Sequence, residues 1–579
     1  MKICILLIAT LLLAGCKSAR SRDASAQTSR ATSDTEFNAL TDDFLRGYLA
    51  WRPNIGVSLG LHEYDGKITD YSSDSLAREL QRLKDFDRKF AALNTNALSK
   101  RVHSDYRILR SEIRGELFRF EDQKVFTDNP MTYATAVDLN IYIKRNFAPL
   151  PQRVKSIVAI EREVPRVLQA ARQNLKLDLA KPFVETAIDE AQGVVDFLGR
   201  DLTDALKEIK DPEFDAANKA AIGEFEKYVE WLQKERLPSA HSSYALGRDT
   251  FYKMVREGEL IQLTPEKILE KGLKELKREQ AVFAETARKL DPSKSPIDVF
   301  KAIQKDHPTE QNLIPDTKKN LEAIRRFCEE HKILTFPSPV RARVEETPTY
   351  LRATSFASMD TPGPFEKKAT EAYYYVTPTE KDWPPQQKEE WLTAFNYYTT
   401  DIVSIHEAYP GHYTQFLCLN ASPANRLEKI ISSYAFVEGW AHYTEQMLVD
   451  QGFGAGSLKY RLAQSDEALL RLCRLCVAIK THCEGMSVDA ATRFFQDNCY
   501  YEEKPARQEA TRGTYDPEYL YYTLGKLQIL KLRDDYKKQE GSAYSLQKFH
   551  DELLRHGMPP IRLLRETMLK DASKWDEVF

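Results

Sequence analysis

The sequence predicts a mainly α protein, a large helical array of two lobes with a small β element beside a cleft. Apolar residues recur at intervals of three and four along most of the chain, which is the period of amphipathic helices. The 579 residues exceed the size at which one compact core usually keeps growing. We therefore expect two lobes, at about residues 36–335 and 336–579, with a strand signal at the start of the second.

The composition is that of a folded protein without a footprint for nucleic acid. Hydrophobic residues make up 42% and charged residues 29% of the chain, as in ordinary globular domains. The 83 basic and 86 acidic residues give a formal net charge of −3. Since nucleic-acid binding needs a surplus of basic side chains, this balance argues against it.

The N-terminus has the features of an export signal with a lipid attachment site. Met1 and Lys2 precede an apolar run from Ile3 to Ala14, which is too short to span a bilayer. The ending Leu-Ala-Gly-Cys at Cys16 resembles a bacterial lipobox, so we predict a signal peptide at 1–15 and a flexible tether at 16–35. An ordinary secretory signal with a chance cysteine is the alternative. Lys17 favours the outer membrane, with the chain lipid-anchored in the cell envelope and facing the periplasm.

Helices are expected on both sides of one irregular stretch. The strongest helical patterns cover residues 37–53, 75–93, 104–120, 185–209, 218–237 and 264–290. From about residue 336 the chain is rich in Pro, Thr and Ser, and then reads EAYYYVTP at 371–378. This aromatic and β-branched run predicts a strand at the floor or rim of a cleft, although a surface hairpin without a role fits equally well.

The segment SIHEAYPGHYTQF, at 404–416, contains a zinc-type pair in His406 and Glu407. The usual motif places the second histidine four residues after the first, but here His412 follows six residues later. On a regular helix these two side chains would lie about 120° apart around the axis. Pro410 lacks the N–H of a regular turn, and Gly411 tolerates unusual backbone angles. We therefore expect a bulge that returns His412 to a ligand position, the alternative being a kinked helix with two unrelated histidines.

A second helix supplies the acidic partner that a metal site of this kind needs. In SSYAFVEGWAHYTEQML, Glu438, His442 and Glu445 lie on one helical face. Catalytic zinc usually takes three protein ligands, so Glu438 is the expected third ligand beside the two histidines. His442 is a rival ligand or an interfacial histidine, and Glu445 is expected to accept a hydrogen bond from a ligand imidazole.

These segments resemble a known bacterial family. DIVSIHEAYPGHYTQF (401–416), SYAFVEGWAHYTEQML (433–448) and YLYYTLGKLQILKLRDDY (519–536), with RPNIGVSLGLHEYDG near the N-terminus, are similar to the family catalogued as domain of unknown function 885. The HEAYPGH element relates that family to the gluzincin metallopeptidases, mainly helical enzymes with a deep cleft. The resemblance implies a metallopeptidase-like fold, Zn²⁺ held by His406, His412 and Glu438, and Glu407 as catalytic base.

The resemblance also implies further site residues. Either Tyr522 or, in its place, the adjacent Tyr521 would stabilise the oxyanion, Tyr522 being the expected one. His482 would be the catalytic partner of that tyrosine. Arg512 would bind a substrate carboxylate. The strand with Tyr374 would be the edge strand that binds an extended peptide substrate.

The expected function is zinc-dependent hydrolysis of peptide bonds, in short peptides, through metal-activated water. One alternative is a hydrolase of another amide, such as a cell-wall peptide. The other is a metal-binding scaffold lipoprotein without catalysis, against which the intact Glu407 argues.

Overall fold

The structure, a computed structural model, describes residues 32–348, 352 and 356–579. The predicted signal peptide, the lipid site at Cys16 and most of the predicted tether lie outside the described residues. A helix covers residues 32–51, so residues 32–35, which we predicted as the end of the tether, belong to the folded part. The described chain is mainly helical with one small sheet, which agrees with the predicted fold class.

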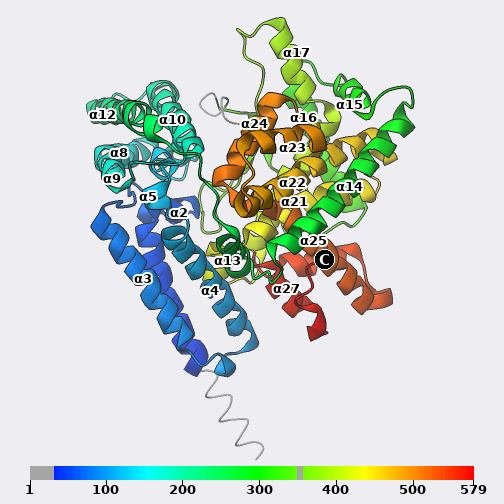
Figure 1. Ribbon diagram of the computed structural model, residues 1–579, viewed down its shortest axis with the longest axis horizontal. Helices are drawn as coiled ribbons and strands as arrows, with labels where there is room; N and C mark the ends of the chain where they lie inside the picture. The colour runs from blue at the N-terminus through cyan, green and yellow to red at the C-terminus, as the bar shows by residue number, and fades with distance from the viewer. Residues whose placement is uncertain (1–31, 349–351, 353–355) are drawn as a thin grey trace, which may run out of the picture.

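The N-terminal lobe is built from helices packed around one apolar core (Figure 1, blue to cyan). After the helix at 32–51 come α2 (Pro53–Ser58), α3 (Ser73–Ala91), α4 (Lys100–Glu121), α5 (Val125–Asp128), α6 (Met131–Ala134), α7 (Asn140–Lys144), α8 (Leu150–Glu161), α9 (Val164–Asn174), α10 (Lys181–Asp196), α11 (Thr203–Ala205) and α12 (Pro212–Trp231). Short π-helical segments, Phe197–Leu202 and Leu232–Arg236, follow α10 and α12.

The rest of the chain forms the larger, C-terminal lobe (Figure 1, green to red). Its helices are α13 (Arg248–Gly258), α14 (Pro265–Leu290), α15 (Pro296–Gln304), α16 (Leu313–Glu330), α17 (Pro385–Ala394), α18 (Tyr397–Glu407), α19 (His412–Ala421), α20 (Arg426–Ile430), α21 (Tyr434–Asp450), α22 (Leu458–Glu484), α23 (Val488–Cys499), α24 (Glu503–Tyr515), α25 (Tyr521–Glu540), α26 (Leu546–Leu554) and α27 (Ile561–Met568). None of the helices within the described residues is long and apolar enough to cross a membrane.

The apolar core does not divide at the predicted boundary near residue 335. The first core cluster takes nearly all its residues from 37–232, whereas buried residues of α13, α14 and α15 share a second cluster with α22 to α25. The contact is close where α14 crosses α22, since a Cβ on Gly272 would lie 2.2 Å from Leu475 Cδ2. The lobes therefore meet after α12, about 100 residues earlier than the sequence pattern suggests.

The small sheet has the strand order β1-β3-β2, from β1 (Arg343–Glu346), β2 (Ala357–Asp360) and β3 (Tyr373–Val376). β3 pairs in parallel with β1, where Tyr374 is opposite Val344, and antiparallel with β2, where it is opposite Met359. The strand predicted from the aromatic run is therefore present but central. Our prediction that it is an edge strand is wrong, because both of its edges are already paired.

Candidate metal centre

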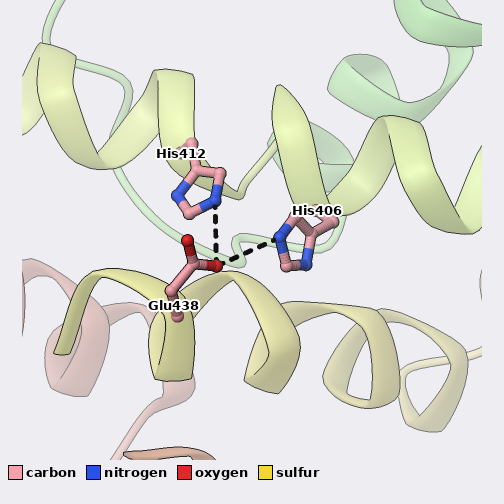
Figure 2. Close-up of side chains that lie close together, drawn as sticks. All are labelled: His406, His412 and Glu438. Carbon is pink, nitrogen blue, oxygen red and sulfur yellow. Dashed lines mark ion pairs between the residues drawn. The ribbon is translucent and has the colours of Figure 1, made fainter. Parts of the chain in front are cut away.

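Three side chains meet on the facing sides of α18, α19 and α21. His406 Nε2 and His412 Nε2 each lie 3.5 Å from the same oxygen, Oε2 of Glu438 (Figure 2). The two imidazole rings are nearly perpendicular, with centroids 4.8 Å apart. His406 is buried, and His412 and Glu438 are partly buried. Within the described residues this is the one group of His, Cys, Asp or Glu side chains with three ligand atoms close enough to share a metal ion.

The break between the two histidines is what allows them to face one carboxylate. α18 ends at Glu407 and α19 begins at His412, with a cis peptide between Tyr409 and Pro410. The amide of Gly411 donates to Ile405 O at 3.0 Å, six residues back instead of four. A Cβ on Gly411 would lie 1.8 Å from the carbonyl oxygen of His406, so only glycine fits this close approach. The predicted interruption is thus present, as two helices joined by a short loop.

Neighbouring elements hold this loop in place. Trp440 of α21 is fully buried and donates from Nε1 to the carbonyl of Pro410 at 2.9 Å. In addition, the amide of Ala342 donates to the Tyr409 hydroxyl at 2.9 Å. The turn between the histidines is therefore fastened both to the helix that carries Glu438 and to the start of the sheet.

Glu445 orients His406 from behind. Its Oε1 accepts from His406 Nδ1 at 2.7 Å, which leaves Nε2 of that ring free to face Glu438. Its Oε2 lies 3.0 Å from His442 Nδ1, and Arg471 reaches Oε1 at 3.4 Å. The expected role of Glu445 as a hydrogen-bond acceptor is present. His442 instead turns its Nε2 towards Lys526 Nζ, 3.5 Å away, and is not part of the ligand group.

The donor set fits Zn²⁺. Two imidazole nitrogens and one carboxylate oxygen are typical of catalytic zinc sites, where ligand distances of about 2.0–2.2 Å in a tetrahedron separate ligand atoms by roughly 3.3–3.5 Å. The two histidine–glutamate distances of 3.5 Å agree with that spacing. Glu438 Oε2 and His412 Nδ1 are buried and have no hydrogen-bond partner among the described residues, so Oε2 is available to a cation.

The charges of the centre favour a cation between the three residues. Burial lowers the pKa of His406, but the neighbouring carboxylates of Glu438 and Glu445 outweigh it and raise the pKa to about 9. Burial likewise opposes ionisation of Glu438, yet the two histidines hold the pKa of this carboxyl well below its usual range. The site therefore stabilises positive charge, which a bound metal ion supplies as well as a proton does.

Tyr522, at the start of α25, stands next to the three residues. Its ring lies 6.4 Å from that of His406, and Tyr434 of α21 packs against it at 5.9 Å. Two buried guanidinium groups of α22 lie over the ring, Arg474 at 5.2 Å and Arg471 at 5.8 Å. Burial and the charge of Glu438 raise the pKa of Tyr522, which keeps its hydroxyl protonated as a hydrogen-bond donor.

The sequence profile of a family described as "Bacterial protein of unknown function (DUF885)" matches residues 53–568. The chain belongs to the DUF885 family. Two solved structures share its fold. A candidate lipoprotein of unknown function from Shewanella oneidensis has 23% identity and a TM-score of 0.78, covering 92% of this chain and 100% of its own. A candidate lipoprotein from Colwellia psychrerythraea has 16% identity and a TM-score of 0.76, covering 93% of this chain and 98% of its own. No curated protein matches the chain.

Two residues predicted for the site of this DUF885 protein have side chains that are engaged by other parts of the chain. Both ring nitrogens of His482 are engaged by main-chain groups, Nδ1 by the amide of Leu246 at 3.3 Å and Nε2 by the carbonyl of Gly513 at 2.8 Å. Its prediction as a catalytic partner is corrected, because it ties α22 to two neighbouring segments. Tyr374 is fully buried and its hydroxyl accepts from Ser404 Oγ at 3.2 Å, so its side chain supports α18.

The structure also places the two adjacent tyrosines in different surroundings and adds residues that the sequence pattern did not reveal. Tyr521 turns away from the metal centre towards Glu259 and Glu518, whereas Tyr522 faces it. Arg512, predicted to bind a carboxylate, is close to Tyr522 but forms an ion pair with Asp516 at 2.8 Å. Arg471 and Arg474 were missed. Two cations one turn apart in the otherwise apolar stretch 468–479 of α22 were the available signal.

Proposed function

We propose that this DUF885 protein is a zinc-dependent hydrolase of peptide bonds that acts on short peptides. One observation supports the proposal above all others. The ligand atoms of His406, His412 and Glu438 converge on one point, with the carboxylate of Glu407 at the adjacent position of α18. A purely structural metal site has no need of an acid at that position, whereas hydrolysis needs a base there. The arrangement is a variant of the gluzincin site in which the two histidines are six residues apart.

In the proposed reaction, different residues hold the metal ion, transfer the proton and stabilise the oxyanion. His406, His412 and Glu438 would hold the ion, and bound Zn²⁺ would supply Lewis-acid polarisation of the carbonyl and a lowered water pKa. Glu407 takes a proton from the attacking water and passes it to the leaving amine. The Tyr522 hydroxyl donates to the carbonyl oxygen as negative charge develops on it, which lowers the barrier most in a site closed to water.

The surroundings of Tyr522 support this assignment. Arg471 and Arg474 place two positive charges on its ring face, and both are buried at 8% exposure. These cations are fixed by acidic partners, Arg474 by Glu509 at 2.7 Å, so the field at the hydroxyl is set before substrate arrives. An oxyanion next to Tyr522 would benefit from that field.

The proposed location is the bacterial cell envelope, with the chain attached to the outer membrane by a lipid on Cys16 and facing the periplasm. The lipobox-like sequence supports this location, and both similar structures are described as candidate lipoproteins. Peptide substrates would come from that compartment.

Metal content and peptide hydrolysis of the purified full chain test the proposal. We expect one Zn²⁺ per chain in the wild type and in Glu407→Gln, and none in His412→Ala. Mass spectrometry of a mixture of short peptides should show cleavage by the wild type alone. A wild type without zinc, or a Glu407→Gln variant as fast as the wild type, would refute the proposal. Stoichiometric zinc with cleavage of cell-wall peptides only would move the substrate to that class.

A further inference from the structure

A cavity of about 310 Å³ lies between the lobes, next to the proposed catalytic centre. One wall comes from α4 and α13, and the other from the N-terminus of α21 and the chain around Glu518 and Tyr521. Its volume is within the range of small-ligand sites. No residue of the metal centre lines it, so the cavity is distinct from the place where the ion would sit.

Tyr434 connects the cavity with the metal centre. This residue lines the cavity, and its ring also packs against Tyr522 at 5.9 Å. Tyr434 and Glu438 are four residues apart on α21, so they share one face and are separated by about 6 Å along the axis. An extended peptide advances about 3.3–3.6 Å per residue. A substrate held at the centre would therefore place a group about two residues from the scissile bond in this cavity.

The wall of the cavity is acidic. Five glutamates line it, against three basic residues: Glu112, Glu116, Glu257, Glu259 and Glu518, with Arg114, Arg119 and Lys253. Arg114 and Arg119 are exposed, and so is Glu518. Lys253 is held by Asp122 at 2.5 Å, and Glu116 forms an ion pair with Arg52. At the floor, Glu259 is buried at 5% exposure and accepts from the Ser433 hydroxyl and the Ala435 amide.

The Tyr521 hydroxyl is a polar group at the floor that lacks a partner. Tyr521 is 1% exposed and lines the cavity, yet its hydroxyl has no hydrogen-bond partner among the described residues. The charges of Glu518 and Glu259 both act on it. A buried hydroxyl without a partner is costly, so a ligand atom that bonds to it is expected.

The carboxyl groups around the cavity indicate which kind of ligand it would bind. Burial raises the pKa of Glu259 to about 7, and the charge of Glu518, a residue that is itself exposed to solvent, adds to this rise. Positive charge brought into the cavity would relieve this cost. A bare metal ion is the poorer fit, since these carboxylates do not bring three ligand atoms together anywhere in the described residues.

We propose that this cavity is a subsite for a primary ammonium group of the substrate, received by Glu518, Glu259 and the Tyr521 hydroxyl. The inference rests on the proposed function in assigning the ammonium group to the substrate. Its source is either the free amino terminus or a lysine-like side chain, carried about two residues from the bond that is cleaved. The subsite thus defines the substrates as amine-bearing peptides.

Binding to the full chain tests the subsite independently of hydrolysis. Calorimetry with zinc-loaded Glu407→Gln would compare an N-acetylated peptide containing lysine, the same peptide with Nε-acetyl-lysine, and a peptide with a free amino terminus and no lysine. We expect one amine-bearing peptide to bind at least about tenfold more tightly than the fully acetylated one, as for a charged hydrogen bond. The arm that gains affinity identifies the source of the amine.

Variants then link that preference to the cavity. Glu518→Gln should remove most of the preference and Tyr521→Phe part of it, while Glu226→Gln, at an exposed position of α12, leaves it unchanged. Equal affinities for all three peptides, or a preference that survives Glu518→Gln, would overturn the subsite. Hydrolysis without any amine preference refutes the subsite alone, whereas amine-selective binding without hydrolysis refutes only the proposed function.

Discussion

Gly439 of α21 and Gly525 of α25 meet backbone to backbone. A Cβ on Gly439 would lie 2.5 Å from the carbonyl carbon of Gly525, and a Cβ on Gly525 would lie 1.8 Å from the carbonyl oxygen of Ala435. Glu438 immediately precedes the first glycine and Tyr522 lies one turn before the second. The close approach of the two helices therefore sets the distance between a proposed metal ligand and the proposed oxyanion donor.

Replacing Gly525 by alanine should lower catalysis while leaving metal binding intact. The added methyl group cannot fit against Ala435, so α25 must shift and carry Tyr522 with it. Because a displacement of about 1 Å can cost roughly a hundredfold in rate, we expect kcat to fall at least about tenfold. Zinc content, set by α18, α19 and α21, should remain one per chain.

The matched control is Gly193→Ala in α10, where a Cβ would meet no atom within 4 Å. Alanine there should keep full activity and stabilise the helix by up to about 1 kcal/mol, as measured by urea unfolding. If Gly525→Ala is as active as Gly193→Ala, the glycine contact does not position Tyr522.

Glu445→Gln tests how His406 is oriented. The glutamate accepts from His406 Nδ1 at 2.7 Å, and an amide can present its NH₂ group there instead, which would disturb the ring. We expect zinc affinity to fall about ten- to a hundredfold, measured by competition with a chromogenic chelator. Glu467→Gln is the control, because Glu467 also pairs with Arg471 but does not touch His406. Equal losses in the two variants would assign the effect to Arg471.

Tyr522→Phe should impair the chemical step while leaving metal binding intact. Removing one oxyanion donor typically costs about a hundred- to a thousandfold in kcat, with little change in KM. The measurement is steady-state hydrolysis together with the zinc content of the same samples. Tyr544→Phe removes a hydroxyl outside the site and should leave both kinetic constants unchanged. A higher KM with an unchanged kcat would instead show that Tyr522 binds the substrate.

The local parts of the candidate site could be predicted because they depend on short spacings. Pro410 and Gly411 exclude a regular turn, and the four-residue periodicity of α21 puts Glu438 and Glu445 on one face. Their meeting with His406 then follows from the chemistry of a metal site. Helical periodicity was equally sufficient to predict a mainly α fold.

The errors arose where distant segments determine the outcome. β3 is central because β1, some 30 residues earlier in a stretch without periodicity, pairs with it. The lobe boundary is displaced because α14 packs on α22, almost 200 residues later. His482 is held by the carbonyl of Gly513 and the amide of Leu246, and no motif encodes such main-chain partners. Each case depends on a long-range contact that periodicity and spacing do not contain.

Glu161, at the end of α8, should make the N-terminal lobe less stable as pH rises. The side chain is fully buried and neither carboxyl oxygen has a hydrogen-bond partner among the described residues. Burial alone raises the pKa of Glu161 from its usual 4.5 to about 8. The folded state thus holds a proton that the unfolded state releases between these values, and stability falls through this window by about 1.4 kcal/mol per pH unit.

Glu161→Gln, neutral at every pH, should match the wild type at pH 4 and be more stable at pH 8 in urea unfolding. Glu163 is a partly exposed neighbour paired with Arg166, and Glu163→Gln should leave the free energy of unfolding unchanged at both pH values. A wild type and a Glu161→Gln variant with parallel pH profiles would show that the carboxyl is ionised in the folded protein.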